Sequence, residues 1–285
     1  MIRIEVEQAK KIAEEALQVL AEELEGGKSA TLKAYLTAMA RFPSYSLRNT
    51  LLITSQRPDA TRVAGFRAWR QLGRYVRKGE RGIAILAPIV CRTRNSKNRQ
   101  HEPTDNEHDD DRLAGFRTAY VFDLSQTDGN PLPAFAIVRG SPGVYLERLK
   151  NLVTSRGVRL TFTARIAPAL GVSVPGEIML LPSLPPAEEF TTLVHELAHT
   201  MLHESVAGNT RNKTVLETEA EAVAFVVCQA IGLETGSASS DYIHLWDGDA
   251  KTLAASLSRI RGAASEIIKA VQVAQPKAQT VARVA

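Results

Sequence analysis

Two histidines four residues apart constrain this sequence more than any other feature, because they lie in a segment that is typical of a helix. The segment is His-Glu-Leu-Ala-His at 195–199, and an apolar pair flanks it on each side. Positions four apart share one face of an α-helix, so both imidazoles can reach one ion while Glu196 lies beside it. A catalytic zinc ion takes three protein ligands and keeps one position open for water. The pattern therefore predicts a zinc site with His195 and His199 as ligands and Glu196 as general base.

The third zinc ligand is expected on the next helix, which is predicted over 214–232 and begins with several acids. Glu219 and Glu221 are the competing candidates for this ligand. Glu217 lies one turn before Glu221 on the same helix face and can orient a ligand histidine from outside the coordination shell. The alternative is that the His-Glu-Leu-Ala-His segment occurs by chance on an amphipathic helix and binds no metal.

Other polar residues near the motif have roles that the sequence leaves open. His203 lies eight residues after His195, about 12 Å along a helix, so one ion does not take both. A surface position or a supporting position near the metal is expected for His203. Tyr242 and His244, on a helix predicted over 239–247, can stabilise a developing oxyanion, and we take Tyr242 as a candidate catalytic residue. The alternative is that Tyr242 is a packed aromatic side chain.

Positive charge is concentrated between Arg41 and Arg99. This stretch holds fourteen basic residues against two acids, although the whole chain has a net charge of only +4. Twelve of the fourteen are arginine, and aromatic residues are interleaved with them, a combination that proteins use to hold single-stranded nucleic acid. The candidate DNA contacts are Arg48, Asn49, Trp69, Arg74, Tyr75, Arg77, Lys78 and Arg81. The alternative is that the aromatics are core residues and the arginines only solvate the surface.

The order of predicted elements indicates an α+β protein of two domains, an N-terminal α+β domain over 1–130 and a second domain over 133–273. Residues 92–112 are expected to form a flexible insertion, 125–132 a linker, and 274–285 a frayed tail. Helices are predicted over 5–25, 31–41, 47–56, 66–72, 143–155, 187–203, 214–232, 239–247 and 250–273. Strands are predicted over 61–64, 82–90, 116–124, 158–163 and 177–181.

Cysteine content and hydropathy exclude several classes of protein. Two cysteines far apart in the sequence argue against a disulfide framework, and Cys228 in an apolar run is expected to be a buried, inert thiol. The first residues do not have the pattern of a signal peptide, and no apolar run approaches the roughly 20 residues that span a bilayer. The sequence therefore predicts a cytoplasmic protein with no membrane partner.

The second domain resembles the zincin-like metallopeptidases of the ImmA/IrrE type. The resemblance rests on Thr-Leu-Val-His-Glu-Leu-Ala-His at 192–199, on Glu-Ala-Glu-Ala at 219–222, and on the apolar run 225–230. In that family the second acid of the Glu-x-Glu-Ala element is the metal ligand, which implies Glu221 here. The resemblance also implies zinc-dependent peptide hydrolysis, in which Glu196 takes the proton of the attacking water and delivers it to the leaving amine.

The first domain resembles the N-terminal single-stranded-DNA-binding domain of ArdC-type antirestriction proteins. The matching segments are Ser-Leu-Arg-Asn-Thr-Leu-Leu at 46–52 and the run from Phe66 to Gly82, and 240–246 is similar to the C-terminal helices of that family. The resemblance implies a protein that binds single-stranded DNA and shields incoming mobile-element DNA from host restriction. Two alternatives are a DNA-activated zinc protease that cleaves a repressor or DNA-bound protein, and a non-catalytic DNA-shielding module with a structural zinc.

Overall fold

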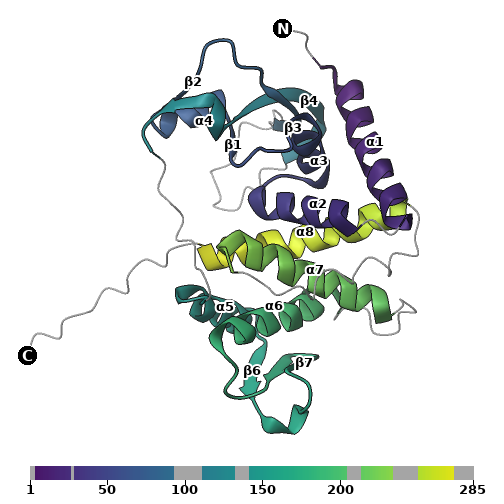
Figure 1. The fold of residues 1–285 in the computed structure, drawn as a ribbon, viewed down its shortest axis with the longest axis vertical. Helices are drawn as coiled ribbons and strands as arrows, with labels where there is room; N and C mark the ends of the chain where they lie inside the picture. Colours follow the sequence, from purple (N-terminus) through teal and green to yellow (C-terminus); the bar gives the residue numbers. More distant parts are fainter. Residues whose placement is uncertain are drawn as a thin grey trace, which may run out of the picture. The chain divides into compact units, whose positions relative to one another are not determined.

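The computed structural model describes residues 4–26, 29–92, 111–131, 141–203, 213–233 and 250–272. Within these ranges the chain is a mixed α+β protein, which confirms the predicted fold class (Figure 1). It divides into two compact units. Unit 1 contains Met1–Ala16 and Arg48–Pro131, and unit 2 contains Leu17–Leu47 and Leu132–Ala285. Tyr242, His244, nearly all of the predicted insertion and the predicted tail lie outside the described residues.

Unit 1 is built around a three-stranded antiparallel sheet with the order β1-β4-β3. Its strands are β1 (Val63–Gly65), β3 (Ile83–Arg92) and β4 (Asp111–Asp123), and β3 and β4 form a long hairpin with a register shift between Ile89 and Val90. A separate pair joins β2 (Arg74–Val76) to β5 (Thr127–Gly129). The helices of this unit are the first part of α1 (Val6–Glu25), α3 (Leu47–Gln56) and the short α4 (Phe66–Gln71).

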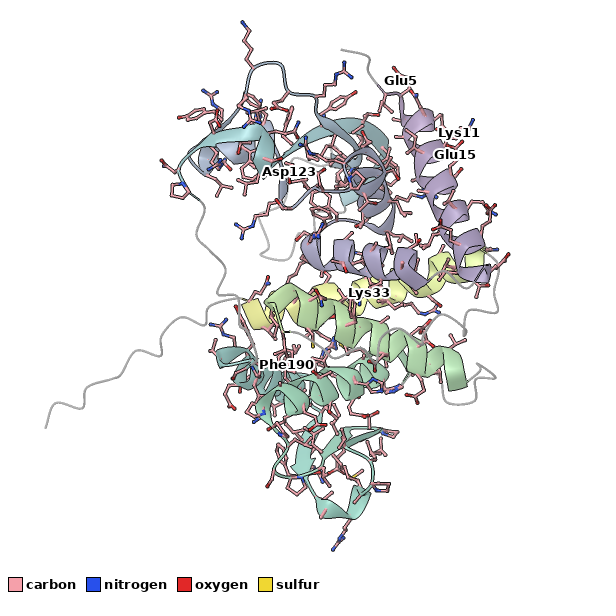
Figure 2. The ribbon with its side chains drawn as sticks, in the orientation of Figure 1. Glu5, Lys11, Glu15, Lys33, Asp123 and Phe190 are labelled. Carbon is pink, nitrogen blue, oxygen red and sulfur yellow. The ribbon has the colours of Figure 1, made fainter. Side chains whose placement is uncertain are left out.

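Buried polar side chains fix the connections of unit 1. Asp123, labelled in Figure 2 at the end of β4, is buried and accepts hydrogen bonds from the backbone N–H groups of Thr61 (2.7 Å) and Arg62 (3.0 Å). It also caps the 3₁₀ turn Leu124–Gln126. Burial raises the pKa of Asp123, but these hydrogen bonds and those from Ser125 outweigh burial and hold the pKa below its ordinary value.

Unit 2 packs helices on one another and on a small sheet. Besides the second part of α1, its helices are α2 (Ser29–Arg41), α5 (Val144–Ser155), α6 (Pro186–His203), α7 (Lys213–Ile231) and α8 (Ala250–Gln272). Figure 1 shows α6, α7 and α8 side by side, and α7 contacts both of its neighbours. The sheet has the order β6-β8-β7, in which β6 (Arg159–Phe162) runs parallel to β8 (Glu177–Leu180) and β7 (Gly171–Val174) antiparallel to it.

The core of unit 2 lies between α6 and its neighbours. Phe190, labelled on α6 in Figure 2, is fully buried together with Leu193 and Leu197. The apolar run of α7 includes Cys228, which is also fully buried, and burial raises the pKa of its thiol to about 12. The expectation of a buried Cys228 is therefore confirmed, and at neutral pH its thiol stays protonated and unreactive.

Three short strands differ from the sequence prediction. The segment 125–132 was expected to be a linker, but it contains a 3₁₀ turn and β5, which pairs with β2. Neither β2 nor β7 was predicted. These strands are three or four residues long, too short to show the alternation of apolar and polar residues by which strands are recognised.

The compact units also differ in one place from the expected domains. Residues Leu17–Leu47, which were expected in the first domain, belong to unit 2, where α2 packs against α7. The break between Pro131 and Leu132 lies close to the expected one. The domain boundaries as such stay a prediction. Among the described residues, none of the helices has the length and apolar character required to cross a bilayer.

Candidate metal centre and nucleic-acid surface

The helix α6 carries the histidine motif into the interior of unit 2. Pro186 occupies its first position, where the missing N–H removes no helical hydrogen bond, and Glu188 and Glu189 place negative charge at the positive end of the helix dipole. The apolar face of α6 is buried, and Glu196 is buried along with it. The helix therefore has a fixed rotation, which presents His195 and His199 to α7.

Three ligand atoms converge between α6 and α7. The two Nε2 atoms of His195 and His199 are 3.1 Å apart, and each is 3.4 Å from Oε2 of Glu217. These three residues form the only group of potential metal ligands found within the described part of the chain. Two atoms bonded to zinc at about 2.0–2.1 Å and at the tetrahedral angle lie about 3.3 Å apart. The spacing of the three atoms therefore fits one zinc-sized ion.

The other nitrogen of each imidazole has a partner of its own. His195 Nδ1 lies 3.1 Å from Oε2 of Glu221, and His199 Nδ1 lies 3.1 Å from Nδ1 of His203. Metal-binding histidines use one ring nitrogen for the ion and the other for an orienting hydrogen bond. Both imidazoles have this arrangement, with Nε2 directed at the convergence point.

The two acids Glu217 and Glu221 have positions opposite to those expected. Glu221 was predicted as the third ligand and Glu217 as the residue that orients a histidine. In the structure Glu217 lies near both Nε2 atoms, whereas Glu221 contacts the far side of the His195 ring. The two residues share a face of α7, and the position of α7 along α6 decides which of them meets the histidine pair. The identity of the third ligand is taken up as a proposal below.

Glu196 faces the strand β7. Its carboxyl group has hydrogen bonds from the side chain and backbone of Ser173. Burial raises the pKa of Glu196, and these hydrogen bonds offset part of the rise. The close approach depends on Gly171, because a Cβ there would lie 2.8 Å from Cγ of Glu196 and 2.6 Å from Cγ2 of Thr192. The sequence offered no signal for either β7 residue.

The pKa values of the two imidazoles are shifted in opposite directions. Burial lowers the pKa of His195, but the carboxylates, Glu221 first, reverse this and leave the pKa raised. For His199 burial and the neighbouring His195 together lower the pKa. A neutral imidazole is the form that binds a metal, and burial together with the neighbouring His195 keeps His199 in this form.

The residues predicted as DNA contacts fall into two groups. Three of them hold the fold of unit 1. Trp69 is buried and donates from Nε1 to the carbonyl of Phe122, and Asn49 is buried and bonds both the N–H and the carbonyl of Leu86. Arg74 donates to Thr127 Oγ1 and to backbone carbonyls around β5. The polar groups of these three side chains are therefore used within the fold of unit 1.

The remaining candidates are accessible. Arg48, Tyr75, Arg77, Lys78 and Arg81 are exposed, although Arg77 is held by Glu80 and by the carbonyl of Ser125. Three more exposed residues of aromatic or basic type lie on α4 and were not among the predicted DNA contacts: Phe66, Arg67 and Arg70. Tyr75 is 57% exposed and Phe66 50% exposed, so both rings are accessible for stacking on a base.

The N-terminal part of the chain, which includes most of unit 1 and Leu17–Leu47 of unit 2, matches a known protein family. Residues 7–122 match the family described as the N-terminal domain of anti-restriction factor ArdC. The chain carries an ArdC N-terminal domain. The segments 46–52 and 66–82, on which the resemblance was based, lie within the matched residues.

The ArdC likeness extends beyond this domain at the level of the fold. A crystal structure of the antirestriction ArdC protein from the R388 plasmid, in a metal-free state, is 18% identical with a TM-score of 0.50, covering 91% of this chain and 95% of its own. A Mn(II)-bound structure of that protein is 17% identical with a TM-score of 0.48, covering 79% and 83%. The chain therefore consists of an ArdC N-terminal domain followed by a region that shares the ArdC fold.

A curated relative from Bacillus anthracis, described as an uncharacterised protein, is 24% identical over 272 residues. The match covers 82% of this chain and 46% of the relative, so the chain spans about half of the relative's length.

Proposed function

We propose that the chain is an antirestriction protein of the ArdC type, in which unit 2 is a zinc-dependent peptidase and unit 1 binds single-stranded DNA. The observation that carries the enzymatic part is the convergence of His195, His199 and Glu217 next to the buried Glu196. The ArdC N-terminal domain supports the DNA-binding part. The role itself is the protection of mobile-element DNA from host restriction.

The metal ligands in this proposal are His195, His199 and Glu217. Two imidazole nitrogens and one carboxylate oxygen form a donor set that suits zinc and leaves a fourth position open. Glu221 is the alternative third ligand, on the strength of the family resemblance, and then Glu217 would orient a histidine. The spacing of Oε2 of Glu217 from the two Nε2 atoms favours Glu217.

Bound zinc would polarise a carbonyl group and make a water molecule more acidic. Glu196 accepts the proton of the attacking water and returns it to the leaving amine. Burial raises the pKa of Glu196, which makes its carboxylate a stronger base toward the water proton. Ser173 keeps the carboxyl group beside β7 by its hydrogen bonds. Tyr242 stays a candidate for stabilising the oxyanion, on the basis of the sequence alone.

The test of hydrolysis uses Glu196→Gln in the zinc-loaded protein, with Glu188→Gln, an exposed acid on the same helix, as the matched control. Glu196→Gln should keep zinc but lose cleavage of a peptide or protein substrate, by about 10²-fold or more. Cleavage that survives in Glu196→Gln and disappears on removal of the metal would show that another group is the base.

We place the DNA strand on the exposed basic and aromatic residues of unit 1. Arg48, Lys78 and Arg81 are available to phosphates, and Tyr75 offers a face for stacking a base. A pocket with a volume of about 610 Å³ lies between the end of α3 and the turn before β3, and Arg57 and Arg81 line it. Phosphate contacts of this kind are recognised by their dependence on salt.

A salt series measures these contacts. The affinity for a fluorescent single-stranded oligonucleotide is compared among the wild type, Lys78→Ala/Arg81→Ala, and the control Lys10→Ala/Lys11→Ala on α1. If both Lys78 and Arg81 contact phosphates, the slope of log affinity against log salt falls by about 1.4, at roughly 0.7 per contact. Equal slopes in all three proteins would remove these residues from the DNA surface.

Two alternatives make different predictions. A DNA-activated protease cleaves its substrate only when single-stranded DNA is added. A DNA-shielding module with a structural zinc keeps full antirestriction in the Glu196→Gln variant. Glu196 is enclosed between α6 and β7 and interacts electrostatically with His195 and Glu217, which favours a catalytic zinc site over a structural one.

A further inference from the structure

A continuous series of polar contacts connects α8 to the imidazole of His199. Arg259 on α8 donates from Nε to Oε1 of Glu219 at 3.1 Å, and Ser256 Oγ donates to the same oxygen at 2.6 Å. The other carboxylate oxygen of Glu219 lies 3.2 Å from Nε2 of His203. Nδ1 of His203 in turn lies 3.1 Å from Nδ1 of His199.

The direction of these hydrogen bonds follows from Glu219. Its side chain is completely buried, and its carboxyl group is paired with the guanidinium group of Arg259 and accepts a hydrogen bond from Ser256. A buried carboxyl group in contact with a guanidinium group is held in its ionised form. An ionised carboxylate only accepts hydrogen bonds, so Nε2 of His203 must carry a proton and donate it. In a neutral His203 the other nitrogen, Nδ1, is then an acceptor.

The same reasoning continues to the metal ligand. If Nδ1 of His203 accepts, then Nδ1 of His199 must be the donor. A neutral His199 that is protonated at Nδ1 has its lone pair at Nε2, the atom directed at His195 and Glu217. The contacts that begin at Arg259 therefore select the tautomer of His199 that can bind a metal.

We propose that Glu219, Arg259 and His203 are positioning residues of the metal centre, which hold His199 in its metal-binding tautomer and orientation through this series of hydrogen bonds. The inference rests on the metal site of the proposed function. None of the three is a ligand in it, and Glu219 in particular is directed away from the convergence point.

The arrangement explains why the two imidazoles are supported differently. His195 meets a carboxylate directly, at Glu221, whereas His199 lies one turn further along α6 and meets His203 instead. His203, the last residue of α6, contacts Glu219, which also binds Ser256 and Arg259 on α8. A polar group on α8 is thus connected to the centre, although α8 supplies none of its ligand atoms.

A simpler explanation is that Glu219 and Arg259 only stabilise the packing of α7 against α8. Substitution of His203 distinguishes the two explanations, because it leaves the contacts of Glu219 with Arg259 and Ser256 in place. His203→Leu removes both hydrogen bonds of the series. His203→Gln can restore them, since its amide has an oxygen to accept from His199 and an NH₂ group to donate to Glu219.

The experiment measures Zn²⁺ affinity by competition with a chromophoric chelator, and the visible spectrum of the Co²⁺-substituted full-length protein. His203→Leu and Glu219→Gln should weaken Zn²⁺ binding by about 10- to 100-fold and change the Co²⁺ spectrum. His203→Gln should lie close to the wild type. The control Glu266→Gln breaks the ion pair of α8 with Arg156 and should change neither quantity.

The outcomes distinguish this inference from the proposed function. A wild type that binds neither ion would refute the metal site itself. A wild type that binds Zn²⁺, together with a folded His203→Leu of equal affinity and unchanged Co²⁺ spectrum, would overturn the positioning role alone. If Glu219→Gln does not fold, the comparison of His203→Leu with His203→Gln decides, because neither disturbs the pairing of Glu219 with Arg259.

Discussion

Three glutamates on one helix illustrate how position alone assigns chemistry to identical side chains. Glu217 and Glu221 are four apart on the face of α7 toward α6; Glu217 is close to both histidines, and Glu221 contacts His195. Glu219, two residues from each, is fully buried toward α8 and binds Arg259 and Ser256. The helical period therefore separates the two acids that contact the histidines His195 and His199 from the acid that contacts α8 and His203.

The roles of Glu217 and Glu221 can be separated by single substitutions. We expect Glu217→Gln to lower Zn²⁺ affinity by more than about 100-fold, because it removes a charged ligand, and Glu221→Gln to lower it by about 10- to 100-fold, because it only releases His195. Isothermal titration of both variants measures this order. The reverse order would make Glu221 the ligand, as the resemblance implies.

The prediction from sequence names both histidines of the group in which three ligand atoms converge, but it names Glu221 and not Glu217 as the third member. His195 and His199 follow from the period of one helix, whereas the choice between Glu217 and Glu221 depends on how far α7 is shifted along α6. That shift is set by tertiary packing. Trp69 presents a related difficulty, since a tryptophan among arginines has the same sequence pattern whether it stacks on a base or fills a core, and in the structure it is buried.

At the scale of elements, the centre depends on the close packing of α6 against the edge strand β7. The strand was missed in the sequence because four residues carry no clear alternation. Arg259 was missed as well, because an arginine on an amphipathic helix has the pattern of a solvated residue. By contrast, α6, α7 and α8 were located within two residues at each end, since long amphipathic segments with clear breakers define helices.

The contact between β7 and α6 can be tested at Gly171. A Cβ at Gly171 would lie within 2.6–2.9 Å of Thr192 and Glu196 atoms, so Gly171→Ala should destabilise the protein by about 1–3 kcal/mol and impair hydrolysis. The matched control is Gly262→Ala in α8, where no atom lies within 4 Å. That change should stabilise by about 0.5–1 kcal/mol. Thermal unfolding of both variants provides the comparison, and equal shifts would contradict the close packing.

The junction of α7 and α8 predicts a dependence of stability on pH. Folding lowers the pKa of Glu219 from 4.5 to about 2, so the ionised group stabilises the folded state above pH 4.5, and this contribution is lost as the pH falls toward 2. Its size is on the order of 3 kcal/mol. Urea unfolding of metal-free wild type and Glu219→Gln should therefore differ most near neutral pH. A difference that stays constant down to pH 2.5 would contradict the assignment.

At the scale of the whole molecule, the two compact units are not consecutive in the sequence. Unit 2 takes Leu17–Leu47 from the N-terminal part of the chain, and the buried side chains of α2 include Leu32, Leu36 and Met39. The sequence does not show that this segment belongs to unit 2, because α2 has an ordinary apolar face that could pack against a helix of either unit.

A fragment of residues 133–285 tests whether unit 2 needs Leu17–Leu47 for its stability. It lacks α2, and the face of α7 that α2 covers would be exposed to water. We expect it to unfold at a lower urea concentration than unit 2 of the full chain, or to aggregate. Addition of residues 17–47 through a linker should recover stability. A fragment as stable as unit 2 of the full chain would show that α2 contributes little.

The central claim is that one divalent ion binds between α6 and α7, and the zinc content of the purified protein tests it most directly. After loading and dialysis, elemental analysis should find one zinc per chain in the wild type and in Glu196→Gln. The double variant His195→Ala/His199→Ala should retain none while keeping its helical circular dichroism. Zinc that is absent from the wild type, or that remains bound in the folded double variant, would contradict the account.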